Sequence, residues 1–278
     1  MYILSINSSV SCDNFLRDDH EKQVFGQVRI HMKKELEHMR KFSRREVLAG
    51  GSLAVVGFGL GLGTSTLLNI PNPQVVGSPA TPNDALQLLL QGNQRFVSGS
   101  TVVYPNQSVQ LRTQLAGGQS PWAVVLGCID SRVPPELVFD VGLGDIFVTR
   151  TAGQVIDDVV LGGIEFGVEE FSSVMLVMVL GHESCGAVKA AIQTIQSNGH
   201  ADGSIQTLVD AIQPAYESAL GQPGDLVGNV INANIALEVE KLKSVDMISQ
   251  AISAGSLAVV GAYYDLGTGE VTVTVPPS

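Results

Sequence analysis

The sequence predicts an α/β domain in which a mostly parallel central sheet is flanked by helices and followed by a C-terminal strand hairpin. Two patterns indicate this fold class. Short valine-rich apolar runs, typical of strands buried on both faces, alternate with amphipathic stretches of helical periodicity. The chain then closes with a strand, the turn sequence "DLGTG" and a last strand. Strands that alternate with helices favour a parallel sheet that is covered on both faces.

The first helix and the first two strands have clear local signals. Residues 81–99 open with Thr, Asn and Asp side chains that can cap a helix, and apolar residues then recur at helical spacing until Gly99. The run "WAVVLGC" (122–128) is continuous and rich in valine, which predicts a strand buried on both faces. The stretch "DIFVTRTAG" (145–153) predicts a second strand of the same kind.

The remaining elements continue the alternation as one domain, because no repeat and no internal linker follows residue 80. A third buried strand is indicated by the run "SSVMLVMVLGH", and helical periodicity surrounds it. The expected elements are a helix over 159–171, a strand over 172–182, a helix over 184–195, a loop over 197–204, helical segments over 205–220 and 225–254, and a closing hairpin over 256–275.

The charge of the chain is unevenly distributed. The net charge is −11 overall, and residues 1–80 contain nine Lys and Arg against seven Asp and Glu. Residues 81–278 contain seven basic and twenty acidic side chains, a net charge of −13. A domain this acidic is not expected to bind nucleic acid or an anionic membrane surface.

The N-terminal part predicts export from the cytoplasm. Arg44 and Arg45 lie just before the uncharged, glycine-rich stretch 47–70, the pattern of a twin-arginine signal peptide. Small residues at 78–80 suit cleavage before Thr81. The alternative is a retained membrane anchor, since the stretch 47–70 is long enough to span a bilayer. We therefore expect a periplasmic or cell-envelope protein that meets the membrane only through an uncleaved leader or the export machinery.

Residues 1–38 do not resemble the start of an export signal, because their charges are mixed. Met39 would give a well-formed start. We therefore interpret residues 1–38 as a mis-assigned or non-native extension, 39–80 as the export signal and 81–278 as the catalytic domain.

Three side chains suited to binding a metal follow two of the predicted strands. Cys128 ends the first strand, and the sequence "GHESCG" (181–186) places His182 and Cys185 at the end of the third. Ligands gather at the carboxyl ends of parallel strands, so these side chains can converge on one tetrahedral ion. Two thiolates and an imidazole suit zinc, and a three-ligand set leaves one position open, as in catalytic zinc sites. The alternatives are buried cysteines that act as small hydrophobic residues, or a disulfide between Cys128 and Cys185.

A charged pair beside the first cysteine favours the catalytic interpretation. Neither alternative explains why Asp130 and Arg132 lie next to Cys128. Arg132 can hold the carboxylate of Asp130 with a bidentate fork. Asp130 can then accept a hydrogen bond from a zinc-bound hydroxide.

The motifs "CIDSR" (128–132) and "GHESCG" (181–186) together resemble those of the β-class carbonic anhydrases, and the similarity covers most of residues 81–278. The resemblance implies one Zn²⁺ per subunit held by Cys128, His182 and Cys185, with Asp130 and Arg132 as catalytic residues. It also implies reversible hydration of carbon dioxide to bicarbonate and a proton, and a homodimer or higher homo-oligomer.

The resemblance extends to two substrate-pocket positions at the subunit interface. Gln119 matches a glutamine that hydrogen-bonds substrate, and Phe147 matches an aromatic wall of the pocket, so both can serve the neighbouring subunit's zinc. Without the family, Gln119 is an ordinary loop amide and Phe147 is strand core. Two alternative functions also remain open: hydrolysis of carbonyl sulfide or carbon disulfide on the same fold, and a non-catalytic zinc or thiol module.

Overall fold

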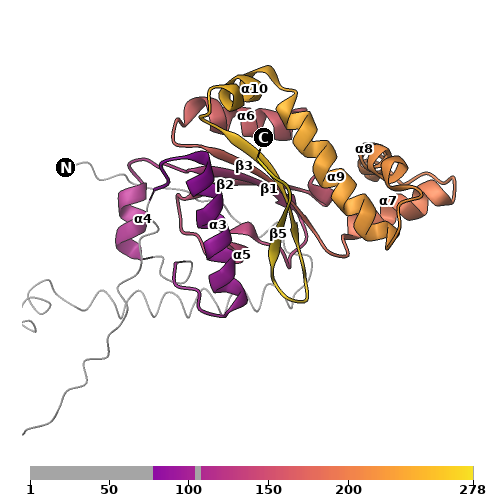
Figure 1. Ribbon diagram of the computed structural model, residues 1–278, viewed down its shortest axis with the longest axis horizontal. Helices are drawn as coiled ribbons and strands as arrows, with labels where there is room; N and C mark the ends of the chain where they lie inside the picture. The colour runs from indigo at the N-terminus through magenta and orange to yellow at the C-terminus, as the bar shows by residue number, and fades with distance from the viewer. Residues whose placement is uncertain (1–77, 104–107, 278) are drawn as a thin grey trace, which may run out of the picture. The chain divides into compact units, whose positions relative to one another are not determined.

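The computed structural model describes residues 78–103 and 108–277 (Figure 1). The predicted export signal and the extension before it lie outside these residues, apart from residues 78–80. Among the helices of the described part, none is both long and apolar enough to cross a membrane.

A five-stranded sheet forms the centre of the described fold, with strand order β2-β1-β3-β4-β5. The first four of these strands are parallel, and β5 pairs with β4 in the antiparallel direction. The α/β prediction with a closing hairpin is therefore confirmed. The strands are β1 Ala123–Cys128, β2 Ile146–Thr151, β3 Leu176–His182, β4 Ala258–Tyr264 and β5 Val271–Val275.

Helices precede, connect and cover the strands (Figure 1). Thr81 caps the first described helix as predicted, since its side chain accepts a hydrogen bond from the Asp84 N–H. The helices are α3 Pro82–Val97, α4 Val109–Leu115, α5 Pro135–Val138, the 3₁₀ helix η3 Ala152–Gln154, α6 Asp158–Glu170, α7 Gly186–Gln196, α8 Ile205–Ala219, α9 Leu226–Lys243 and α10 Asp246–Ser253.

Two predicted elements differ in their boundaries, and two helices were not predicted. The expected strand over 145–153 ends at Thr151, because Gly153 and Gln154 both adopt positive φ and turn the chain into η3. The helical segment predicted over 225–254 divides into α9 and α10, because Val245 is extended. Helices α4 and α5 were not predicted, and each is shorter than two full turns of a typical amphipathic helix.

The two faces of the sheet carry separate apolar cores. Alternate residues of β1, such as Val124 and Leu126, pack with α6, α7, α8 and α9, whereas Val125 packs with α3 and α5 on the opposite face. Every residue of β1 and β3 is buried. The carboxyl ends of these two strands are adjacent, because Gly127 pairs with Leu180 in the parallel register.

Candidate metal centre

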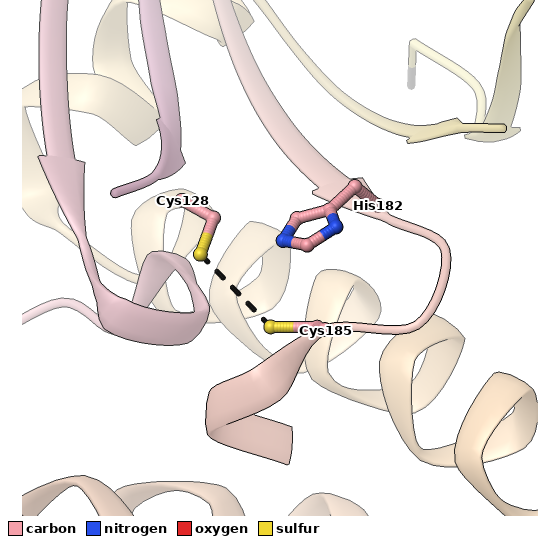
Figure 2. Close-up of side chains that lie close together, drawn as sticks. All are labelled: Cys128, His182 and Cys185. Atoms are coloured by element: carbon pink, nitrogen blue, oxygen red, sulfur yellow. Dashed lines mark hydrogen bonds between the residues drawn. The ribbon is translucent and has the colours of Figure 1, made fainter. Parts of the chain in front are cut away.

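The three predicted ligands converge at the carboxyl edge of the sheet (Figure 2). One ligand atom from each of Cys128, His182 and Cys185 lies within 4.8 Å of the others, and the two sulfur atoms are 3.9 Å apart. All three residues are almost fully buried. Cys128 ends β1, His182 ends β3 and Cys185 caps α7, so two rigid strands and a helix start position the cluster.

A sharp turn allows His182 and Cys185 to face the same point. Ser184 lies between them with φ of 55°, a left-handed conformation that non-glycine residues adopt at a cost of roughly 1–3 kcal/mol. Cys185 directly precedes the first turn of α7, where the backbone of Ala187 and Val188 acts to lower the pKa of its thiol. The helix N-terminus thus favours negative charge on this sulfur.

The imidazole of His182 is oriented as a metal ligand. Its Nδ1 lies 2.8 Å from the Glu183 carbonyl oxygen, which can only accept, so Nδ1 carries the proton. The lone pair of the ring is then on Nε2, which is buried without a hydrogen-bond partner in the described structure. A buried imidazole nitrogen without a partner, placed beside two thiols, fits the donor set of a tetrahedral zinc site.

The pKa values of the two thiols are shifted in opposite directions. A hydrogen bond from Cys185 lowers the pKa of the Cys128 thiol well below its ordinary value, although burial acts in the opposite direction. The same contact, together with burial, raises the pKa of Cys185. Cys128 is therefore poised as a thiolate, the form that binds metals. The cysteines are both free, and their sulfur separation is far longer than the ~2.05 Å of a disulfide.

Asp130 and Arg132 form the predicted bidentate pair at the rim of this cluster. Arg132 donates from Nε to Oδ1 at 2.9 Å and from Nη2 to Oδ2 at 2.7 Å, and its backbone N–H also donates to Oδ1 at 2.9 Å. These bonds hold the pKa of the Asp130 carboxyl far below its ordinary value. Oδ2 lies 3.9 Å from Nε2 of His182, so an ionised carboxylate stands beside the cluster without being one of its three members.

Two residues that hydrogen-bond to the segment 128–130 were missed by the sequence analysis. Arg150 on β2 donates from Nε to the Cys128 carbonyl at 2.7 Å and from Nη2 to the Asp130 carbonyl. The N–H of Gly153 donates to the Cys128 sulfur at 3.3 Å. An arginine within the strand predicted over residues 145–153 was a signal that could have identified Arg150.

The two substrate-pocket residues lie away from the cluster within this chain. Gln119 is exposed and lines an open hollow of about 640 Å³ together with Arg112, Leu115 and Gly144. Phe147 lies near the start of β2, whereas the register partner of Cys128 is Thr151 at the end of that strand. The ring of Phe147 packs edge-on against Phe171, with centroids 5.0 Å apart. Within one chain, Phe147 is therefore part of the packing between β2 and α6.

Comparison with known proteins identifies similar sequences and folds. The sequence profile described as carbonic anhydrase matches residues 123–271. Carbonic anhydrase 2 of Mycobacterium tuberculosis is 41% identical over 196 residues, covering 69% of this chain and 92% of that protein. The carbonic anhydrase of Mycolicibacterium smegmatis is 39% identical over 197 residues, covering 69% of this chain and 93% of that protein.

Solved structures with the same fold include two β-carbonic anhydrases. The Coccomyxa enzyme in complex with acetazolamide matches with a TM-score of 0.56 and 24% identity, covering 69% of this chain and 87% of that one. A tetrameric enzyme from Sordaria macrospora matches with a TM-score of 0.54 and 22% identity, covering 70% of this chain and 99% of that one.

Proposed function

This chain belongs to the carbonic anhydrase family, and from that premise we propose that it hydrates carbon dioxide reversibly with one zinc ion held by Cys128, His182 and Cys185. The observation that carries the proposal is the convergence of three buried ligand atoms within 4.8 Å of one another. The orphaned Nε2 of His182 supports it, since that atom lacks the partner that a metal would supply.

The chain's own residues supply orientation and a hydrogen-bond acceptor. Zinc, when bound, supplies a Lewis-acid position that lowers the pKa of water toward neutrality. Asp130 accepts a hydrogen bond from the attacking oxygen and directs a lone pair of that oxygen toward the carbon of carbon dioxide. Arg132 keeps the carboxylate ionised and aimed. One carbon–oxygen bond forms, bicarbonate leaves, and the proton from water passes to solvent.

The decisive experiment removes the charge of Asp130 while keeping its shape. We expect Asp130→Asn to retain zinc and to lose hydration activity by about a hundredfold or more, because a neutral amide is a weaker hydrogen-bond acceptor than a carboxylate. Glu217→Gln, an exposed substitution on α8, is the matched control and should leave activity unchanged. Stopped-flow hydration measured with zinc content on one sample gives the readout, and full activity in Asp130→Asn refutes the role of Asp130.

The same sample also separates the alternative functions. Turnover of carbonyl sulfide or carbon disulfide without hydration of carbon dioxide would favour the sulfur substrates. Bound zinc without any turnover would favour a non-catalytic module.

A second copy of the chain completes the site in this proposal. Helix α6 presents Val159 and Phe166, which are 84% and 59% exposed, on either side of the exposed glycines Gly162 and Gly163. These four positions follow helical spacing and form one apolar face. Strand β2 at the adjacent sheet edge is half-buried throughout. A homodimer formed through this face places Gln119 and Phe147 of one subunit near the zinc of the other.

Charge on the apolar face tests the assembly. We expect Phe166→Glu to shift the protein to a monomer in light scattering and to reduce activity while zinc stays bound. Glu165→Gln, one residue earlier on the helix, is the control. A dimer that persists in Phe166→Glu with full activity contradicts this interface.

We further propose that the enzyme is exported to the periplasm or cell envelope. The support is the Arg44–Arg45 pair before the uncharged stretch 47–70, which lies outside the described residues. Replacing both arginines with lysine should keep the protein in the cytoplasm, and mass spectrometry of the exported form should give Thr81 as its first residue. Unchanged export of the double variant would remove the twin-arginine assignment, and a retained stretch 47–70 would indicate an anchor.

A further inference from the structure

The segment after β2 contacts the metal centre through its backbone. Gly153 and Gln154 adopt φ of 73° and 48°, two successive left-handed conformations. This turn aims the Gly153 N–H at the Cys128 sulfur, 3.3 Å away. A side chain at Gly153 would also crowd Ile212, whose Cδ1 lies 3.2 Å from the position of a Cβ. A hydrogen bond to a ligating sulfur depends on how firmly such a turn is held.

Helix α9 holds this turn from a distant part of the sequence. Asn234 donates from Nδ2 to the Gly153 carbonyl at 2.9 Å, and Lys241 donates from Nζ to the Ile156 carbonyl at 2.6 Å. Glu238 is buried on the helix between these two residues, and the backbone of Ile156 acts to lower the pKa of its carboxyl. The three helix positions are spaced i, i+4 and i+7, so they lie along one face of α9. The helix therefore binds both ends of the segment 153–156.

Close packing brings this face of α9 to the sheet. A Cβ at Gly181 would lie 2.6 Å from Ile235 Cδ1, and a Cβ at Gly261 would lie 2.5 Å from Ile235 Cγ2. Glycines on β3 and β4 thus allow Ile235 to sit directly on the backbone. Gly181 immediately precedes His182, and Asn234 immediately precedes Ile235. The helix is consequently fixed against the strand that carries the imidazole ligand.

Asn234 is an unusual choice for packing alone. It is fully buried among apolar neighbours on α9, including Ile231 and Ile235, and its Oδ1 has no hydrogen-bond partner in the described structure. Burying a half-satisfied amide costs free energy that leucine at this position would avoid. The hydrogen bond to Gly153 is the contact that leucine could not make.

We infer that Asn234 is a positioning residue of the metal centre. Its amide holds the carbonyl of Gly153 and so fixes the backbone conformation of that residue. The N–H of Gly153 then stays aimed at the Cys128 sulfur. This N–H offsets part of the charge on the sulfur and restrains its direction, so Asn234 controls how tightly the site retains zinc. The inference rests on the proposed zinc site and adds a residue that touches neither metal nor substrate.

The test replaces the amide with side chains of similar size. Asn234→Leu removes the donor and satisfies the apolar surroundings, and Asn234→Asp keeps the shape while placing a carboxylate oxygen where the donor is. Asn232→Leu is the matched control, because Asn232 is exposed two residues earlier and its one side-chain hydrogen bond within the described residues is to the Gly228 carbonyl of its own helix. Folding of each variant is verified by thermal unfolding before metal is measured.

Two readouts report on the centre without using activity. One is the rate at which zinc passes to a chromogenic chelator, and the other is the thiolate-to-metal charge-transfer band of the cobalt-substituted protein. We expect faster zinc release by about 10- to 100-fold in Asn234→Leu, with a shifted cobalt band. Asn234→Asp should change in the same direction, and Asn232→Leu should match the wild type.

The outcomes distinguish this inference from the function on which it rests. A folded Asn234→Leu or Asn234→Asp variant with wild-type zinc release and cobalt spectrum overturns the role of Asn234 alone. Equal changes in Asn232→Leu also overturn it, because the effect is then general to α9. If the wild type binds neither zinc nor cobalt at Cys128, the proposed function fails and this inference fails with it.

Discussion

Replacing Glu238 with glutamine should change how the stability of the protein depends on pH. Glu238 is 2% exposed, and burial raises its pKa from 4.5 to about 7, although Lys241 and the Ile156 N–H act in the opposite direction. The folded protein therefore keeps a proton on this carboxyl at pH values where the unfolded chain has lost it. Stability consequently falls as the pH rises from about 4.5 to about 7 and then levels off.

The size of this effect follows from the difference between the two pKa values. One pKa unit corresponds to 1.36 kcal/mol, so the contribution of Glu238 is roughly 3 kcal/mol across this range. Glutamine has nearly the same shape as glutamate, but it does not titrate. The free energy of unfolding of Glu238→Gln relative to the wild type should thus rise by roughly 3 kcal/mol between pH 4.5 and pH 7.5.

Urea unfolding at a series of pH values measures this difference. The single tryptophan, Trp122, is buried beside β1 and reports on unfolding. Bound zinc and other titrating groups affect both proteins alike, so the comparison uses the difference at each pH. Glu240→Gln, an exposed change on the same helix, should keep the wild-type profile. Parallel profiles for Glu238→Gln and the wild type would show that Glu238 does not titrate as described.

Three further substitutions test the surroundings of the centre. Arg132→Ala should lower hydration activity by about tenfold or more with zinc retained, because Asp130 loses its bidentate partner. Hydration rate and zinc content are measured on one sample, and an unchanged rate would contradict this role of Arg132. Arg150→Ala should destabilise the protein by about 2 kcal/mol in urea unfolding, since two carbonyls lose a charged donor, and an unchanged midpoint would argue against this clamp. Gly181→Ala should cost about 1–3 kcal/mol in the same assay through overpacking against Ile235. An unchanged free energy of unfolding would contradict this, since α9 would then move without loss of stability.

Strand and ligand positions were predictable because their signals are local. The valine-rich runs at 122–128 and 172–182 identified two buried strands from composition alone. Once both strands were taken as parallel, Cys128 and His182 had to meet at one edge of the sheet. Asp130 and Arg132 are two residues apart, so their pairing required no knowledge of the tertiary fold.

Contacts between distant segments could not be predicted in the same way. Asn234 and Gly153 are 81 residues apart, and an asparagine within a helical stretch does not reveal its partner. Arg150 points along a strand edge to carbonyls some twenty residues earlier, a contact that depends on strand order. The positions of Gln119 and Phe147 relative to a partner's zinc depend on an interface that one chain does not contain.

A crystal structure of the zinc-loaded protein, with hydration activity measured on the same preparation, tests the central claim most directly. The account predicts one zinc peak in anomalous diffraction per subunit, bonded to the sulfurs of Cys128 and Cys185 and to Nε2 of His182, while Asp130 remains paired with Arg132. An active preparation whose zinc lies elsewhere, or whose zinc has a fourth ligand from the protein, would contradict it.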